Sequence, residues 1–195
     1  MAGLTGGRQR GYGPCMCDMR TGLRLGALAA WAALAAELAA QAPAAAPERA
    51  TVLKAARELM VKARYCGLVT LDATGQPQAR VVDAFEPEAD FTVWIATNPA
   101  TRKVSEIRAD ARVSLLYVTG AEGYVTLIGK ATLVSDPAEK ARRWKDDWLA
   151  FYEDKNRGDD YQLIRVAPSR LEVVSYAHGV LNDPRTWKPV SVELP

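Results

Sequence analysis

A change of hydrophobic period near residue 67 limits the fold more than any other feature of the sequence. Before it, residues 47–64 repeat apolar side chains at three- and four-residue spacing, which is typical of one face of a helix. After it, apolar and polar residues alternate in "LVTLD", "QARVVDAF", "FTVWIAT" and "VSLLYV", which is the period of a β-strand. The Gly and Pro of "ATGQP", between the first two of these segments, predict a hairpin turn.

The rest of the chain continues the β pattern. The long segment "EGYVTLIGKATLV" predicts a strand, and Gly129 within it predicts a bulge or sharp bend, as expected where a sheet curls into a barrel. A short helix is expected over about 99–109, and "YQLIRVAP" and "RLEVVSYA" predict a further pair of strands. The expected fold is therefore mainly β with a few helices (α+β), with six or seven antiparallel strands in a barrel or sandwich.

A second helix is predicted to begin at Asp136-Pro137-Ala138-Glu139, where Asp is a favourable cap and Pro suits the first helical position. Four aromatic residues then follow at spacings that would line one face of this helix. They are Trp144, Trp148, Phe151 and Tyr152. An aromatic stripe of this kind favours packing in the core or at a subunit interface over contact with a ligand.

The N-terminal region has the layout of a secretory signal peptide. Arg20 and Arg24 precede an uncharged, Ala-rich stretch over residues 25–36, which is too short to span a bilayer, and small residues follow. We therefore expect residues 1–42 to be a leader and signal peptide, with Met19 as the true start, and residues 43–50 to be an Ala/Pro linker. The expected location is exported, periplasmic or secreted, without stable membrane insertion after cleavage. An Ala-rich amphipathic or disordered tail and an uncleaved anchor are the alternatives.

Composition excludes several classes of site once this leader is set aside. Residues 1–42 hold four of the 25 Lys and Arg and two of the 23 Asp and Glu, so 21 of each remain and the mature domain is close to neutral. We expect no nucleic-acid partner for so balanced a charge. Cys66 is the one cysteine after residue 42, and His178 is the one histidine, so neither an internal disulfide nor a Cys/His metal site is expected.

The segment "IATNPATRKVSEI" contains an electrostatic anomaly. Arg102 and Lys103 fall in the first turn of the expected short helix, where the helix dipole disfavours cations, and no carboxylate precedes Glu106. An anion bound at this helix start would explain them, because backbone N–H groups, dipole and cations would then act together, and the hydroxyls of Thr97 and Thr101 would add donors. A phosphate group is the natural candidate, and two solvated cations are the alternative.

The wider segment "ATNPATRKVSEIRADARVSLLY" resembles the signature of the pyridoxamine 5′-phosphate oxidase-like family of FMN-binding split β-barrels. That signature reads Tyr-Thr, a short loop, Ser-Arg-Lys, a helix and then "RVSLL", and the likeness extends over about residues 50–177. The resemblance implies that residues 51–195 form an FMN-binding split-barrel domain. It also implies a homodimer, because the flavin of this family lies in a groove between two subunits.

The resemblance also implies the site residues. The FMN phosphate contacts of the family fall on Arg80, Arg102 and Lys103, with Thr97 and Thr101 nearby. The backbone of Val81 and Val82 would run along the edge of the flavin ring, and Tyr124 would adjoin it. Arg80 lies between Ala79 and Val81 on an otherwise apolar strand, which favours a buried partner over an exposed strand cation.

Departures from the family pattern separate this chain from the true vitamin B6 oxidase. Phe85 replaces a basic residue five positions after Arg80, Tyr124 replaces a Gln near the ring, and the C-terminal Arg-x-His is absent. The sequence resembles the general-stress and uncharacterised flavin-binding branches instead. We expect an exported FMN-dependent oxidoreductase of unknown small-molecule substrate, for which no catalytic acid or base can be named. A non-catalytic flavin- or haem-binding protein, with His178 as the candidate haem ligand, and a deazaflavin pocket are the alternatives.

Overall fold

The computed structural model describes residues 46–195, and Pro47–Pro195 form one compact unit. The predicted signal peptide, the alternative start at Met19 and residues 43–45 of the predicted linker lie outside the described residues. Within residues 46–195, no helix is both long enough and apolar enough to cross a membrane.

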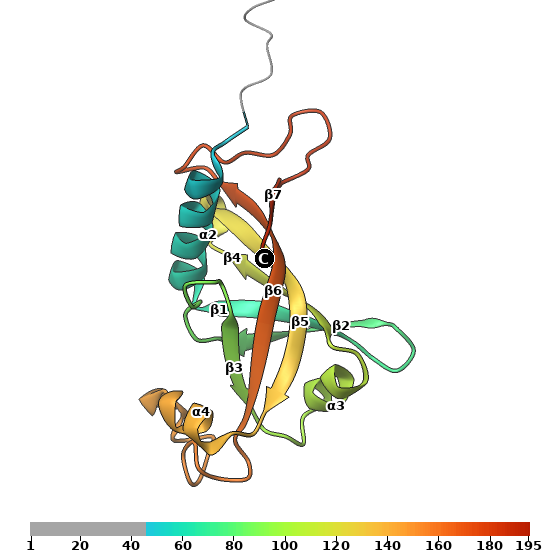
Figure 1. Cartoon of the computed structure of the whole chain (residues 1–195), viewed down its shortest axis with the longest axis vertical. Coiled ribbons are helices and arrows are strands. Elements are labelled where there is room, and N and C mark those ends of the chain that lie inside the picture. Colours follow the sequence, from blue (N-terminus) through green and yellow to red (C-terminus); the bar gives the residue numbers. More distant parts are fainter. Residues whose placement is uncertain (1–45) are drawn as a thin grey trace, which may run out of the picture. The chain divides into compact units, whose positions relative to one another are not determined.

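The described unit is built mainly from strands, as the alternating pattern predicted (Figure 1). The strands are β1 (Tyr65–Leu71), β2 (Pro77–Asp83), β3 (Val93–Thr97), β4 (Arg112–Val118), β5 (Gly123–Val134), β6 (Gln162–Ser175) and β7 (Val190–Glu193). The helices are α2 (Arg49–Ala63), α3 (Arg102–Ala109) and α4 (Pro137–Arg142). Short 3-10 turns occur at Gly120–Glu122 and Asp146–Trp148.

All seven strands belong to one antiparallel sheet in the order β2-β1-β4-β5-β6-β3, with β7 paired to β6. The two ends of this order approach each other where the chain leaves β2, through an isolated bridge between Ala84 and Ile95. No continuous ladder joins β2 to β3, so the sheet curls without closing. This arrangement confirms the prediction of a mainly β fold with a six- or seven-stranded antiparallel split barrel, and the number of strands is seven.

The long hairpin of β5 and β6 contains the predicted bulge. The register of the two strands shifts between Ile128 and Gly129, and a Cβ on Gly129 would lie 2.2 Å from the carbonyl oxygen of Ala167. Pro168 lies opposite Gly129, and a proline is tolerated where the ladder is already interrupted. The sequence predicted two strands, "YQLIRVAP" and "RLEVVSYA", where the structure has the single strand β6. That prediction was wrong, because Pro168 interrupts the hydrophobic pattern without ending the strand.

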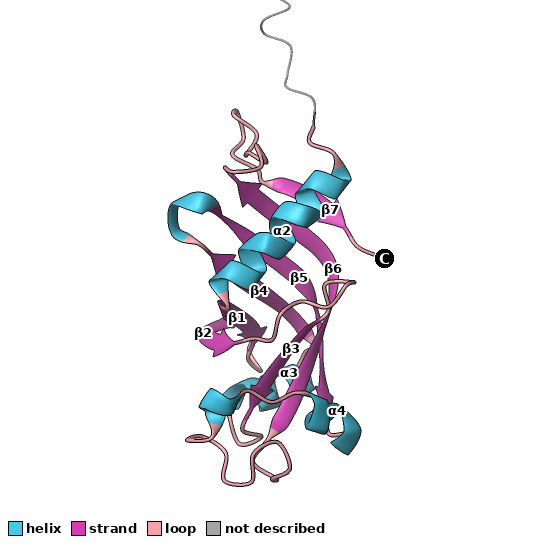
Figure 2. Cartoon of the chain, turned by 90° about the vertical axis from the view of Figure 1, so that its left-hand side faces the viewer, coloured by secondary structure: helices cyan, strands magenta, loops and turns pink. Residues whose placement is uncertain are grey.

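Helix α2 covers one face of the sheet (Figure 2). Its buried residues recur at the spacing that predicted the helix, and they join the main core beneath β4, β5 and β6. They are Val52, Ala55, Ala56, Leu59 and Met60. Among residues 46–195, no helix covers the opposite face of the sheet over β1, β2 and β4, where Val81 is 74% and Val118 is 56% exposed.

The predicted aromatic stripe after Asp136 does not lie on a helix. Asp136 does cap α4 by accepting a hydrogen bond from the Ala138 N–H (2.8 Å), but the helix ends at Arg142. The aromatic residues lie in the irregular segment that follows, so their helix-like spacing was misleading. Three of them pack in a second core with Trp94, Tyr161 and Leu163, as expected; they are Trp144, Trp148 and Tyr152. Phe151 is 74% exposed, so it does not pack in the core of this chain, and its packing at a subunit interface stays a prediction.

Candidate functional site

The first turn of α3 lacks the usual side-chain cap. Thr101 is the cap residue, but its hydroxyl donates to the Asn98 carbonyl (2.8 Å) and makes no capping bond to the helix. No acidic residue lies in this first turn. The side chain of Asn98 is also engaged, since its Oδ1 accepts from the Ala100 N–H (2.8 Å). Because the first N–H groups of a helix have no intrahelical partner, this helix start retains donors for an outside acceptor.

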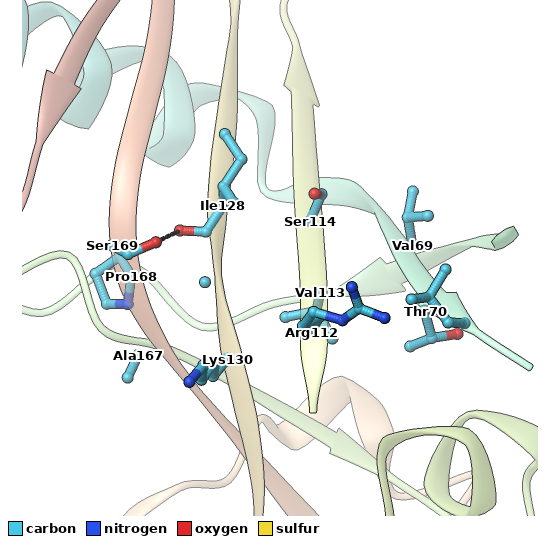
Figure 3. Close-up of a pocket in the computed structure, with 12 residues that line it drawn as sticks. Val69, Thr70, Arg112, Val113, Ser114, Ile128, Lys130, Ala167, Pro168 and Ser169 are labelled. Carbon is cyan, nitrogen blue, oxygen red and sulfur yellow. Dashed lines mark hydrogen bonds between the residues drawn. The ribbon is translucent and has the colours of Figure 1, made fainter. Parts of the chain in front are cut away.

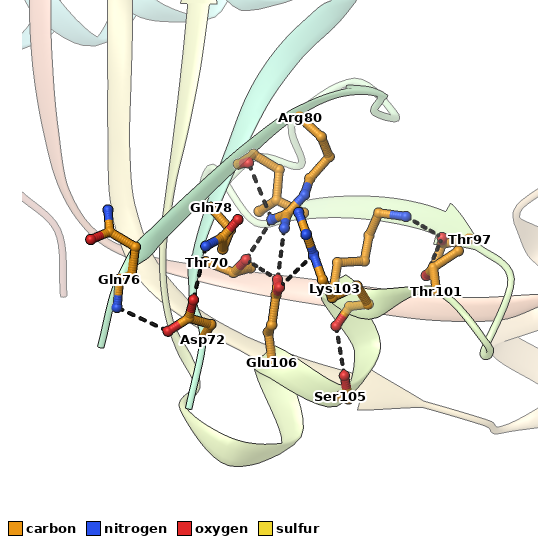
Figure 4. Close-up of polar contacts among 12 residues, drawn as sticks. Thr70, Asp72, Gln76, Gln78, Arg80, Thr97, Thr101, Lys103, Ser105 and Glu106 are labelled. Atoms are coloured by element: carbon orange, nitrogen blue, oxygen red, sulfur yellow. Dashed lines mark hydrogen bonds and ion pairs between the residues drawn. The ribbon is translucent and has the colours of Figure 1, made fainter. Parts of the chain in front are cut away.

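Lys103 contacts a threonine hydroxyl at the end of β3. Its Nζ donates to Thr97 Oγ1 (2.8 Å), and the Thr97 and Thr101 hydroxyl oxygens are 3.2 Å apart (Figure 4). Burial lowers the pKa of Lys103, and the charge of Arg80 lowers it further, whereas Glu106 acts in the opposite direction. The structure thus brings together three of the predicted phosphate-site residues, Thr97, Thr101 and Lys103, and the ammonium group of Lys103 is partly buried.

Arg80 contacts the same cluster through a buried carboxylate. Its Nη2 donates to Glu106 Oε2 (2.7 Å), and its Nη1 donates to Thr70 Oγ1 and, at 3.5 Å, to the Leu68 carbonyl (Figure 4). The side chain of Glu106 is 4% exposed and that of Arg80 is 18% exposed. Glu106 is therefore the buried partner that the alternation predicted for Arg80, and the guanidinium group is largely committed to protein acceptors.

Arg102 is held more loosely. Its Nε lies 3.0 Å from Glu106 Oε1, and its side chain is 67% exposed. Arg80, Arg102 and Lys103, with Glu106 as their shared carboxylate, define what we term the cation cluster. Three cations and one carboxylate leave it with two surplus positive charges.

A pocket of about 630 Å³ adjoins the cation cluster. Four of the eight predicted site residues line it: Val81, Val82, Thr97 and Lys103. Asn98 and an aromatic wall formed by Trp148, Phe151 and Tyr152 also line it. Arg80, Thr101 and Arg102 lie close to Lys103 or Thr97 but are not among the lining residues. The volume is within the range of about 300–1,000 Å³ that is usual for small-molecule sites.

Asp83, which the sequence did not mark as a site residue, holds Trp148 of the aromatic wall in place. Asp83 accepts hydrogen bonds from Arg64 at both oxygens (3.0 and 2.7 Å), from Lys145 Nζ (2.6 Å) and from Trp148 Nε1 (3.0 Å). Despite the opposing effect of burial, these donors lower the pKa of Asp83 to about 2. Asp147 adds a second carboxylate, 2.6 Å from Arg64 Nη2. We term Asp83, Asp147, Arg64 and Lys145 the neutral network, because its two cations balance its two carboxylates.

Tyr124 does not join the other predicted site residues within one chain. It pairs with Val174 at the start of β5. Thr97 instead pairs with Gln162 on β6, next to Leu163, which is the partner of Val134 at the far end of β5. Ten residues of strand separate these ends, which is about 30 Å at ~3.3 Å per residue. Tyr124 does share a face of the sheet with its pairing partner Val118 on β4.

His178, the candidate haem ligand, has both ring nitrogens engaged. Nδ1 lies 3.0 Å from Ser175 Oγ and Nε2 lies 3.1 Å from Glu58 Oε2. The side chain is only 19% exposed. Coordination of iron by His178 would require one of these contacts to break.

A second pocket of about 500 Å³ lies on the sheet near the bulge (Figure 3). Val69, Ser114 and Ile128 line it from three adjacent strands, and Lys130 and Arg112 are also among its lining residues. Arg112 is already paired with Asp110 (2.6 Å). No predicted site residue lines this pocket.

The family model of pyridoxamine 5′-phosphate oxidase matches residues 29–175. Solved structures similar to this chain include General Stress Protein 26 from Bacillus anthracis str. Sterne (18% identity, TM-score 0.59, 72% of this chain and 97% of that chain). A protein related to general stress protein 26 from Clostridium acetobutylicum is also similar (16% identity, TM-score 0.63, 75% and 96%). A heme binding protein from Mycobacterium smegmatis is a third (18% identity, TM-score 0.56, 75% and 59%).

The comparison with curated proteins gives no match. The similar structures show the fold alone at such identities, whereas the family model spans most of the sequence. The chain belongs to the pyridoxamine 5′-phosphate oxidase family.

Proposed function

We propose that this chain is a flavin-binding protein whose cofactor is FMN, with the FMN phosphate held at the start of α3. The observation that carries the proposal is the uncapped helix start beside Lys103, Thr97 and a pocket of about 630 Å³. Backbone N–H groups, the ammonium group of Lys103 and the hydroxyl of Thr97 together form a donor set suited to phosphate oxygens.

The charge of the cation cluster fits a phosphate monoester. Such a group carries about −1.5 to −2 charges at pH 7, and the cluster has two surplus positive charges. Val81 and Val82 line the same pocket as Lys103, which supports the expectation that the flavin ring runs along their backbone. A bound flavin supplies hydride chemistry, and this chain's residues bind it, orient it and exclude water from it.

We propose that the protein is an oxidoreductase acting on a small molecule other than pyridoxamine phosphate. Phe85 occupies the position that is basic in the true vitamin B6 oxidase, and its ring packs edge-on against Trp148 (5.3 Å between centroids). An apolar contact at this position supports a substrate that needs no phosphate contact there.

We also propose that the protein is exported and that its signal peptide is cleaved. These two proposals rest on the sequence of residues 1–42.

We also propose a homodimer that covers the outer face of the sheet. Val81, Gly67 and Leu116 lie in register across three adjacent strands, and the two apolar side chains are 74% and 41% exposed. Tyr65 and Val118 extend this apolar surface. Since Tyr124 lies on the same face, a second copy docked there could supply its Tyr124 to the first copy's pocket.

The visible spectrum of the purified protein tests the cofactor directly. FMN gives flavin bands and haem gives a Soret band, while a deazaflavin is separated by its shifted absorption and by mass spectrometry of the released cofactor. Titration of the apo protein should then show tighter binding of FMN than of riboflavin, which lacks the phosphate. Equal affinities for the two would contradict the phosphate site.

Light scattering tests the proposed dimer. At micromolar concentration it should give twice the subunit mass, and a flavin-loaded monomer would contradict the proposed dimer.

A further inference from the structure

Glu106 is a buried carboxylate whose two oxygens have very different surroundings. Oε2 accepts from Arg80 Nη2 (2.7 Å) on β2 and from the Thr70 hydroxyl (2.5 Å) on β1 (Figure 4). Since the side chain is only 4% exposed, these two donors fix Oε2 against the sheet. One half of the carboxylate is therefore fully used in joining α3 to β1 and β2.

Oε1 has a looser contact. It lies 3.0 Å from Arg102 Nε, close enough for an ion pair. It accepts no hydrogen bond from any residue that the structure describes. Arg102 is 67% exposed, so water can replace the protein around most of its side chain. The contact between Arg102 and Glu106 can therefore break without disturbing Arg80 or Thr70.

We propose that Glu106 is the counter-ion of the cation cluster while the pocket is empty, and that a ligand's phosphate group takes Arg102 from it. This inference rests on the proposed phosphate site at α3. Arg102 turns toward the phosphate, which offers it hydrogen-bond geometry that Oε1 does not. Arg80 stays on Glu106 and keeps α3 in place. Glu106 thus stabilises the empty cluster and, as a nearby like charge, weakens the binding of the phosphate.

The replacement Glu106→Gln tests this exchange. Glutamine keeps the size of the side chain and a carbonyl oxygen for Arg80, but it removes the charge that holds Arg102. We expect the Kd for FMN at pH 7 to fall about tenfold for two reasons. The ion pair between Arg102 and Glu106 no longer has to break, and the repelling charge is gone from a partly buried site where screening is weak. The Kd for riboflavin should stay unchanged. In an Arg102→Gln background, the same replacement should improve FMN binding by no more than about threefold, because the residue that is exchanged is absent.

The control is Asp110→Asn, which removes the same charge from the other end of α3. The carboxylate of Asp110 is paired with Arg112. Only the backbone N–H of Asp110 contacts the cation cluster, by donating to the Glu106 carbonyl (2.8 Å), and the replacement keeps that bond, so FMN affinity should not change. A folded Glu106→Gln protein that binds FMN no better than the wild type overturns the inference.

If the Glu106→Gln variant fails to fold, Arg102→Gln tests the inference in its place. It should weaken FMN binding without changing the apo melting temperature, and unchanged FMN affinity overturns the inference. A wild-type protein that binds FMN and riboflavin equally removes the phosphate site and this inference with it.

Discussion

The neutral network and the cation cluster are each built around one carboxylate, which is partly buried in the first (Asp83) and buried in the second (Glu106), yet their charges differ. Asp83 receives four hydrogen bonds, and with Asp147 it balances the charges of Arg64 and Lys145. In the cation cluster, Glu106 pairs with Arg80 and Arg102, while the third cation, Lys103, contacts Thr97, and one oxygen of Glu106 accepts no hydrogen bond from the described residues.

This difference indicates different roles. A carboxylate with all its partners in place stabilises a fold and has little left to offer a ligand. A cluster with surplus charge and an imperfectly bonded oxygen is less stable by itself and gains by binding an anion. We therefore expect changes in the neutral network to act on stability and changes in the cation cluster to act on ligand affinity.

The largest effect is expected from Asp83→Ala. The change leaves Trp148 Nε1 without its acceptor, and Lys145 keeps only the Ala84 carbonyl (2.7 Å). Since Asp83, Lys145 and Trp148 are partly or fully buried, removing their shared acceptor leaves the donors uncompensated, and the free energy of unfolding should fall by about 2–4 kcal/mol. Urea denaturation of the apo protein measures this. Stability within about 0.5 kcal/mol of the wild type would show that the network is not structural.

The next effect, on ligand affinity, is expected from Lys103→Met. Charge-assisted hydrogen bonds contribute roughly 1.5–3 kcal/mol, so FMN should bind about 10- to 100-fold more weakly. Riboflavin should be affected little. The apo protein should be no less stable, because Met fills the same space without the cost of burying a charge. Titration with both ligands and apo melting curves measure this. Equal loss for both ligands would assign Lys103 to the ring or to the fold instead.

These two regions differ in how far the sequence could predict them. Arg102 and Lys103 were recognisable because they conflict with a local rule about helix starts, which needs only a few neighbouring residues. The neutral network has no local signal, because Arg64, Asp83 and Lys145 lie far apart in the chain and meet only after folding. Glu106 was noticed only as the first acid after the cations. Its contact with Arg80 depends on the placement of α3 against β1 and β2.

The same limit explains the errors in the fold. Periodicity found the strands, the bulge at Gly129 and the cap at Asp136, since each is encoded within a few residues. It divided β6 at Pro168 and extended α4 past Arg142, because local patterns do not report which strand lies opposite or which core receives an aromatic side chain. Tyr124 lies apart from the pocket of its own chain, and only the proposed dimer would bring it there.

Acid should weaken the neutral network in a defined range of pH. Because its donors lower the pKa of Asp83 to about 2 in the folded protein, its contribution is complete above the ordinary pKa near 4. The contribution is lost as the pH falls from about 4 to 2, and we expect it to be about 1–2 kcal/mol after allowance for solvent screening. The free energy of unfolding of Asp83→Asn should therefore fall less than that of the wild type over this range. Parallel acid profiles would assign the loss to other carboxylates.

The smallest effect is expected from Asp147→Asn, which separates the two carboxylates of the neutral network. Asp147 contacts the same Arg64 as Asp83 does, and at a similar distance (2.6 Å), but its side chain is 57% exposed. Exposed ion pairs contribute little, because water solvates both charges and salt screens them. The melting temperature should therefore shift by no more than about 2 °C, although the replacement removes the same charge as Asp83→Asn does. A shift as large as that of Asp83→Asn would mean that net charge, and not the buried hydrogen bonds of Asp83, stabilises this side of the pocket. The neutral network and the cation cluster would then differ in their net charge alone, and not in how completely the carboxylate is hydrogen-bonded.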